Sequence, residues 1–390
     1  MTDILPFPAA LVRPEWADRV VAPMRDTLAP EIAAAVRASN PDSYLHVTRA
    51  AEPGEAPMAV VRDNARALAR LLDAGAFRRL EEPSMFVYRL RAGHHTQTGI
   101  VAEIPVGPFV DGSVRGHEGV HEERVEGVVR HFTHVSARSD LVALMFRRDP
   151  AIDEAIVGAT QAPPDLVVSD PDLEQTVWIL GSRPAVSAIS EVIGKQILYI
   201  TDGHHRVAAS VRRWEEAGRP ADHHVLVVLF PDDQLRAFAF HRRVAGPVDA
   251  ESLLERVRRA CIVEVADGPA VGPGFPGLYL DRRWYRLGDR RGGRRPGVAG
   301  LDVTFVHGAI LEPVFGLVDD DDSRLEVVSA TIAIEDIADR CDADEGALFL
   351  LAPPTLTQLV EVADRGEFMP AKATYFDPKP RSGLFLSLSG

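Results

Sequence analysis

The chain has 390 residues, of which 46% are hydrophobic and 26% charged, proportions that are ordinary for a globular protein with a large core. Its net charge of −14 argues against general nucleic-acid binding, because such binding needs a basic face that neutralises phosphates. No run approaches the roughly 20 apolar residues of a membrane helix, no signal peptide is recognisable, and two cysteines are too few for a disulfide framework. The sequence therefore predicts a cytoplasmic protein that does not enter the membrane.

Lysine is scarce in this chain. Among 43 basic residues the lysines are Lys195, Lys372 and Lys379, and arginine occupies the other basic positions. Because lysine is a compact point charge whereas arginine is a planar fork, a surviving lysine marks a position where the point charge is useful. Chance is the competing explanation.

The N-terminal third predicts short helices followed by a hairpin. A helix is expected at 28–39, a short strand at Tyr44–Val47, and a helix that Asp63 caps and Gly75 ends. Residues 84–104 predict two strands that are joined at Gly93-His94-His95. The two histidines are interpreted as turn residues, because no carboxylate or cysteine stands at metal-ligand spacing.

His117-Glu118 precedes a segment with Val125, Val128 and Val129 on one face, which predicts a helix. An acid just before a helix is favoured by the helix dipole, so Glu118 has a purely structural explanation.

The next segments alternate between strands and helices. Strands are expected at 141–146 and 176–180, with an acidic, proline-interrupted connection at 147–175. A helix is expected at 184–193, where Pro184 takes the first position.

The central stretch is a strand, a turn and a helix. The strand is 197–200, the turn is Asp202-Gly203-His204-His205-Arg206, and the helix carries Val207, Val211 and Trp214 on one face and ends at Gly218. A helix N-terminus with a glycine and cationic side chains is a ready anion site, and cations there are unfavourable unless an anion compensates them. The alternative is that Asp202 caps the helix and that the histidines form a solvated turn.

The C-terminal half begins with a strongly apolar strand at 223–230. A second strand, 237–240, is expected to end at His241-Arg242. Residues 246–300 form a boundary that is rich in glycine and proline, and 301–390 form a last unit with a helical run from Asp302 to Leu311.

These motifs together carry a resemblance. The Asp202–Arg206 turn after an apolar strand resembles the signature of the ParB/sulfiredoxin-like fold, which includes free-serine kinases. The whole chain resembles domain-of-unknown-function family 1015. The matching stretches are Pro6-Phe7, 40–45, His117-Glu118, 200–206, His241-Arg242, 301–303 and 369–379.

The resemblance implies a mixed α+β fold. It consists of a ParB/sulfiredoxin-like core with a mixed sheet and an additional C-terminal α+β unit. The expected segments are 1–83, an α-rich segment packed on the core; 84–245, the nucleotide-binding core; and 246–390, the C-terminal unit.

The function that the resemblance implies is a small-molecule kinase with a nucleotide, ATP or ADP, and Mg²⁺ as cofactors. The partners would be the nucleotide and a small hydroxylated substrate. The expected catalytic residues are His117, Glu118 as the base, and Asp202. The expected phosphate-binding residues are Gly203, His204, His205, Arg206, His241, Arg242, Lys372 and Thr374. No residues are assigned to a protein-held metal.

Two alternatives stand beside the kinase. A non-catalytic nucleotide-binding or sensing protein of ParB-like type would use the same turn without chemistry. A sulfiredoxin-like reaction needs a cysteine in the turn, where this chain has His204. No Walker A motif and no Gly-x-Ser-x-Gly elbow occurs in the sequence, so a P-loop kinase and a serine hydrolase are disfavoured.

Overall fold

The computed structural model describes residues 2–388 apart from Ser136, Ala270, Arg291, Gly293, Arg294, 319–321 and the side chain of Asp26. The described residues form two compact units. Unit 1 comprises 2–115, 120–235 and 378–388, and unit 2 comprises 116–119 and 236–377. Both units combine helices and strands, which confirms the predicted mixed α+β class.

Unit 1 is built on a mixed sheet of eight strands within the described residues. In spatial order they are β6 (Val114–Arg115), β10 (Leu198–Asp202), β7 (Val142–Phe146), β11 (His224–Pro231), β5 (His95–Pro105), β4 (Met85–Ala92), β9 (Glu174–Leu180) and β8 (Leu166–Ser169). The pairs β6–β10 and β7–β11 are parallel, and the other neighbours are antiparallel. The predicted hairpin is β4–β5.

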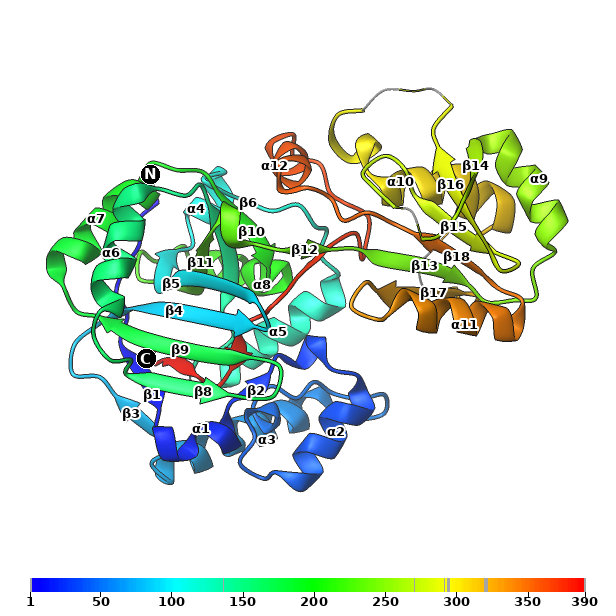
Figure 1. Cartoon of the computed structure of the whole chain (residues 1–390). Helices are drawn as coiled ribbons and strands as arrows, with labels where there is room; N and C mark the ends of the chain where they lie inside the picture. Colours follow the sequence, from blue (N-terminus) through cyan, green and yellow to red (C-terminus); the bar gives the residue numbers. More distant parts are fainter. Residues whose placement is uncertain are drawn as a thin grey trace. The chain divides into compact units, whose positions relative to one another are not determined.

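Two smaller sheets tie the chain ends to unit 1. They are β21 (Phe385–Ser387) with β1 (Ala9–Val12) and β3 (Phe77–Arg79), and β2 (Ala22–Pro23) with β20 (Arg381–Ser382). Both termini therefore lie in the same unit, as Figure 1 shows.

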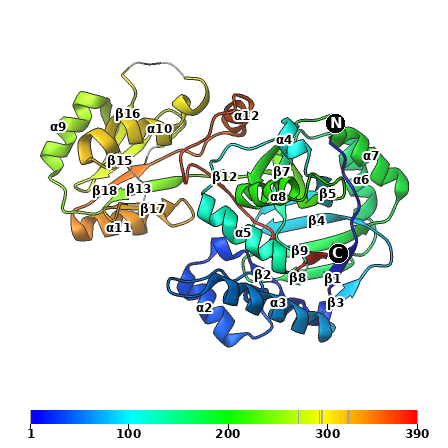
Figure 2. The same cartoon turned by 180° about the vertical axis from the view of Figure 1, so that it is seen from behind.

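Helices cover both faces of the eight-stranded sheet. They are α1 (Pro14–Val20), α2 (Pro30–Ser39), α3 (Pro57–Asp73), α4 (Pro108–Asp111), α5 (Glu122–His134), α6 (Pro150–Thr160), α7 (Arg183–Gly194) and α8 (His204–Glu216). One core contains apolar residues of α6, α7 and α8 with Met85, Val87 and Ile100 of the sheet. The core on the opposite face contains apolar residues of α1 and α3 with Phe86 and Tyr88 of β4. Helix α5 lies against α8 and α3 (Figure 2).

Unit 2 contains a second, antiparallel sheet, six-stranded in its described part. Its strands in order are β14 (Ile262–Ala266), β16 (Arg283–Gly288), β15 (Gly277–Leu280), β18 (Ala347–Leu350), β13 (Phe240–Val244) and β17 (Leu325–Ser329). A separate two-stranded antiparallel sheet pairs β12 (Ala237–Phe238) with β19 (Tyr375–Phe376).

The helices of unit 2 lie on both faces of its sheet. They are α9 (Ala250–Ala260), α10 (Asp302–Val306), the π-helix η5 (His307–Phe315), α11 (Ile334–Asp344) and α12 (Leu356–Asp364). Leu348 and Leu350 of β18 pack with α11, whereas Phe349 points the other way and packs against Phe315 of η5. Figure 1 shows α11 on one side of this sheet and α10 on the other.

Four local predictions were wrong. Asp63 does not cap its helix but lies inside it, because α3 begins at Pro57 after the N-cap residue Ala56. Tyr44–His46 is a 3₁₀ helix rather than a strand, because Ser43 caps it by accepting from the Leu45 N–H at 3.3 Å. The connection 147–175 contains α6, which Asp149 caps. His241 and Arg242 do not follow a strand end but lie inside β13, between β18 and β17.

Candidate functional site

The predicted turn forms the end of β10 and the start of α8. Gly203 is the N-cap residue and has φ = +100°, which is costly for any side-chain-bearing residue. A Cβ at this position would also lie 3.0 Å from Nε and Nη2 of Arg206. Glycine therefore lets the chain turn from β10 directly into the first N–H groups of α8. Those groups lack an intrahelical acceptor.

Asp202 does not cap α8, so the alternative interpretation of this residue was wrong. Its carboxylate lies instead between two cations. Lys379 Nζ donates to Oδ1 at 2.5 Å, and the Arg206 guanidinium donates to Oδ2. Arg206 also donates to the Leu141 carbonyl at 2.7 Å. These three side chains are between 12% and 19% exposed, so they form one partly buried cluster, which we call the turn cluster: Asp202, Arg206 and Lys379.

The electrostatics of the turn cluster keep Asp202 ionised. Burial by itself would raise the pKa of Asp202, but the charges of Lys379 and Arg206 and the Lys379 hydrogen bond lower it below the ordinary value. An ionised carboxylate with a lowered pKa is a weak base. Asp202 is therefore suited to positioning cations rather than to accepting a proton.

The two histidines of the turn are not a solvated turn. His204 is only 5% exposed. The Nε2 of His205 accepts from the His121 N–H at 3.1 Å, and the two imidazole rings stack with centroids 5.9 Å apart. Acceptance at Nε2 requires the neutral ring of His205 to carry its proton on Nδ1.

The other predicted site residues lie in unit 2. His117 is fully buried, and its carbonyl accepts from the Met369 N–H at 2.8 Å. Glu118 forms a parallel β-bridge with Met369. The His117-Glu118 segment is thus paired, within this unit, with the first residue of the 369–379 motif.

Arg242 fixes the same C-terminal segment from the sheet. It is 1% exposed, and its guanidinium donates to the carbonyls of Phe240, Ala371 and Lys372 at 3.0, 3.1 and 3.3 Å. Lys372 has a positive φ of 51°, and its ammonium lies 5.4 Å from the Phe240 ring centroid. Thr374, two residues after Lys372 in the sequence, is also buried.

His241 is the buried neighbour of Arg242. Its Nδ1 accepts from the Leu351 N–H at 3.2 Å. Burial and, to a smaller extent, the charge of Arg242 lower the pKa of His241 to about 4, so the ring is neutral at physiological pH. A neutral ring supplies a hydrogen bond to a phosphate but no charge.

The structure therefore sorts the predicted residues into two groups. Asp202 to Arg206 lie in unit 1, and His117, Glu118, His241, Arg242, Lys372 and Thr374 lie in unit 2. The residue that sequence reasoning left out of the site is Lys379, which reaches Asp202 across 177 positions of sequence. The signal that could have found it was the scarcity of lysine.

Mg²⁺ does not fit the turn cluster as it stands. Both oxygens of Asp202 already accept from cationic donors, and a carboxylate in that state is a poor ligand for a further cation. Among the residues that the structure describes, no group of three histidines, cysteines or carboxylates is placed to hold a metal ion. In the same residues, no helix has the length and apolarity needed to cross a membrane.

Comparison with known proteins gives a family and a set of distant structures. No curated protein matches the sequence. A free serine kinase variant in complex with ADP is similar at 15% identity and a TM-score of 0.38, over 71% of this chain and 87% of that one. A conserved hypothetical protein from Pyrococcus furiosus is similar at 16% identity and a TM-score of 0.37, over 72% and 91%. SbnI with a C-terminal truncation, from Staphylococcus aureus, is similar at 14% identity and a TM-score of 0.39, over 74% and 87%. At TM-scores this low, the ligands of those proteins say nothing about this chain.

The sequence itself gives the stronger result. The model of the family described as "Protein of unknown function (DUF1015)" matches residues 4–304, which is well over half of the chain. The chain belongs to the DUF1015 family.

Proposed function

We propose that the chain binds the phosphates of a nucleotide at the start of α8 and transfers a phosphoryl group to a small hydroxylated metabolite. The observation that carries the proposal is the convergence of Lys379 and Arg206 on Asp202 beside the N-cap Gly203. A helix N-terminus with a lysine ammonium next to it combines N–H donors, a positive dipole end and a point charge. This is the chemistry that holds phosphate.

The members of the turn cluster would have different tasks. Arg206 is tied to Asp202 and to the Leu141 carbonyl, so it braces the turn. Asp202 holds Lys379 in place. Lys379 would stabilise charge on the phosphates, and this role would account for a lysine here in a chain that uses arginine at nearly all of its basic positions.

In the transfer step, the bond between the terminal phosphorus and its bridging oxygen breaks, and a bond to the acceptor oxygen forms. The nucleotide product, shorter by one phosphate, leaves with the bridging oxygen, and the acceptor hydroxyl gives up its proton. The resemblance assigns that proton to Glu118, a half-buried carboxylate. Mg²⁺, when bound to the nucleotide, would neutralise phosphate charge, and no step here depends on a protein ligand for it.

Nucleotide binding is tested by thermal shift with ATP, ADP, CTP and GTP. The comparison is between the wild type, Lys379→Met and the control Lys195→Met, whose lysine makes an exposed pair with Glu191. A nucleotide at about 100 times its dissociation constant stabilises by roughly 2.7 kcal/mol. We expect a shift in the wild type and in the control but not in Lys379→Met. No shift with any nucleotide would refute the proposal.

Catalysis is separated from sensing by Glu118→Gln. If Glu118 is the base, this variant keeps nucleotide binding but loses turnover by about 100-fold or more. Turnover is measured as acceptor-dependent release of the nucleotide that has lost its terminal phosphate, starting with serine as acceptor. A wild type that binds nucleotide but phosphorylates no acceptor would support the sensing alternative.

A further inference from the structure

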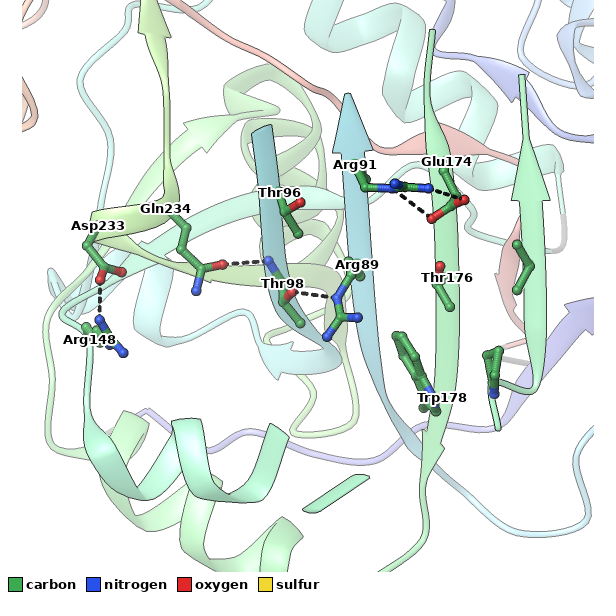
Figure 3. Close-up of a pocket in the computed structure, with 12 residues that line it drawn as sticks. Arg89, Arg91, Thr96, Thr98, Arg148, Glu174, Thr176, Trp178, Asp233 and Gln234 are labelled. Atoms are coloured by element: carbon green, nitrogen blue, oxygen red, sulfur yellow. Dashed lines mark hydrogen bonds and ion pairs between the residues drawn. The ribbon is translucent and has the colours of Figure 1, made fainter. Parts of the chain in front are cut away.

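One end of the eight-stranded sheet of unit 1 carries a hollow that is separate from the turn cluster. Figure 3 shows the residues that line it on β4, β5 and β9. Its volume is about 830 Å³. Its side chains lie on the same sheet face as the core under α6 and α7, because they continue the alternate positions of Met85, Val87 and Ile100. We call it the sheet hollow, with Arg89, Thr98, Thr176 and Trp178 as its floor.

The floor is an ordered row across three strands. In the strand register, Arg89 of β4 stands opposite Thr98 of β5 and opposite Thr176 of β9. Such cross-strand neighbours lie close enough to act together. Thr98 and Thr176 are each 7% exposed and Trp178 is 6% exposed, whereas a flat, solvated sheet face would leave its threonines open. The row therefore lies at the bottom of a concave site.

Arg89 is held in one orientation. Its Nε donates to Thr98 Oγ1 at 3.2 Å, and its guanidinium carbon lies 4.9 Å from the Trp178 ring centroid. The indole is itself fixed, since Nε1 donates to the Ala162 carbonyl at 3.0 Å. A guanidinium that is bound through Nε presents its two Nη groups as a fork, which is the geometry that binds a carboxylate or a phosphate.

The charges around the hollow leave Arg89 as the cation that an anion would meet. Arg91 is paired with Glu174 at 2.7 Å, and Arg148 is paired with Asp233 at 2.7 Å. Arg89 has no carboxylate partner among the residues that the structure describes. The Thr176 hydroxyl makes no hydrogen bond within that part of the chain, and its residue lines the hollow, so the hydroxyl is available to a ligand there. A guanidinium that is fixed in one orientation beside a hydroxyl, with no carboxylate to compensate it in the described part of the chain, is a suitable site for an oxyanion.

We propose that the sheet hollow binds a small molecule through a carboxylate or phosphate group, which the Nη groups of Arg89 and the hydroxyl of Thr176 hold. The volume is that of a metabolite pocket, for which roughly 300 to 1,000 Å³ is usual, and not that of a macromolecular interface. The charge pairs at the two ends, Arg91–Glu174 and Arg148–Asp233, would recognise polar groups on the rest of the ligand. This site does not depend on the proposed kinase function, since it shares no residue with the turn cluster.

The test is calorimetric titration of the full chain with inorganic phosphate in one arm and with citrate in the other. The variants are Arg89→Gln, which keeps a donor toward Thr98, and Thr176→Val, which keeps the shape but removes the hydroxyl. Arg78→Gln, an exposed arginine of β3, is the matched charge control. We expect saturable binding of at least one probe, weakened about tenfold or more by Arg89→Gln, weakened by Thr176→Val and unchanged by Arg78→Gln.

The two arms show whether phosphate or carboxylate is preferred. Binding that survives in both Arg89→Gln and Thr176→Val would overturn the proposal, as would the absence of saturable binding in either arm. Phosphate binding that is lost in Lys379→Met but kept in Arg89→Gln would place the anion at the turn cluster, and this too would overturn it. Because Thr176→Val removes no charge and little volume, it tests the site even if Arg89→Gln folds poorly.

Discussion

Gly203 has two reasons to be glycine, and the structure allows them to be separated. Its φ of +100° disfavours any side chain, and a Cβ would also press on the Arg206 guanidinium. Gly218 at the other end of α8 has a similar φ of +82° but open space around the Cβ position. The difference between alanine variants at these two sites therefore measures the contact with Arg206.

We expect Gly203→Ala to destabilise α8 by about 1–3 kcal/mol and Gly218→Ala to cost less, since only backbone strain applies there. Hydrogen exchange of the α8 amides measures both values in the folded protein. Equal losses in the two variants would mean that the close packing of Arg206 on Gly203 is unimportant.

Lys379→Met removes one of the two cations beside Asp202. Because the pKa of Asp202 is lowered in the folded chain, its ionised form stabilises unit 1 above the ordinary carboxyl pKa, and this stability is lost as the pH falls through the lowered value. In Lys379→Met the carboxylate keeps only Arg206, so we expect a loss of about 1–3 kcal/mol at neutral pH. The loss should shrink as the pH falls below the ordinary carboxyl value of 3.8 toward the lowered pKa of Asp202.

The measurement is urea unfolding of unit 1 at pH 7 and at pH 3, with Lys195→Met as the control. Lys195 is exposed and pairs with Glu191 one helical turn away, so its loss should change little at either pH. A Lys379→Met variant that is as stable as the control at pH 7 would contradict the buried pair.

At the scale of elements, the hydrogen bonds by which Arg242 joins β13 to the segment after α12 can be tested. Its fork donates to three backbone carbonyls, two of them in the segment that follows α12. Lysine keeps the charge but cannot reach three separate acceptors from one ammonium in the same geometry. We expect Arg242→Lys to cost about 2 kcal/mol, on the scale of a charged hydrogen bond.

Hydrogen exchange of β19 and of residues 369–374 should report that loss before the sheet itself opens. Arg283→Lys on β16 is the control, because that side chain is exposed in the same sheet. Faster exchange throughout the sheet, without a selective effect on 369–374, would mean that Arg242 supports the core and not the segment.

The elements that the sequence predicts well are those whose signal is local. The apolar run and the period change around Asp202 correctly predicted β10, the turn and α8, including Gly218 at the helix end. The failure at Tyr44 has a distant cause beside the local cap that Ser43 provides. Gly383, with φ = +80°, packs so closely on the Tyr44 ring that a Cβ would lie 2.7 Å from it. No local pattern around Tyr44 contains that contact, which helps to bury a 3₁₀ turn in place of a strand.

The missed helix α6 is a different case, because its signals are local. Asp149 caps the helix and Pro150 takes its first position, while Ile152 and Ile156 face the core. The surrounding acidic and proline residues concealed a sound helix signature. Here the interpretation of the sequence failed, and not the information in it.

At the scale of the whole molecule, the last residues explain why the site was only partly predictable. Residues 236–377 form unit 2, but the chain then returns to unit 1 and ends in β21 beside β1. Ser387 donates to the buried Glu103 at 2.6 Å, which helps to fix this return. Lys379 reaches Asp202 only because the chain returns to unit 1 after residue 377. A contact over 177 positions leaves no periodicity in either segment, so the motif around Lys379 could be noticed but not placed.

Two buried groups of unit 2 give opposite pH dependences of stability. The pKa of His241 is lowered to about 4 by burial, so its contribution to stability is lost as the pH falls from the unfolded value of 6.5 toward 4. The pKa of Asp302 is raised to about 6, chiefly by burial, although its oxygens accept from the N–H groups of Gly274 and Ala352. Its contribution is present below the unfolded value of 3.8 and is lost as the pH rises through 6. Between pH 4 and pH 6 the two contributions therefore largely offset each other.

Replacing either group should leave the pH dependence of stability that comes from the other group. In Asp302→Asn only the histidine contribution remains, so unit 2 should lose about 3 kcal/mol of stability between pH 6.5 and pH 4 relative to the wild type. In His241→Asn, where the amide oxygen can still accept from Leu351, unit 2 should instead gain about 3 kcal/mol over nearly the same interval. Urea unfolding followed through Trp284, which packs on Tyr279 in this unit, reports both slopes. Because the signs differ, a shift in overall stability cannot imitate the result, and parallel pH profiles for the two variants would refute the assignment of both groups.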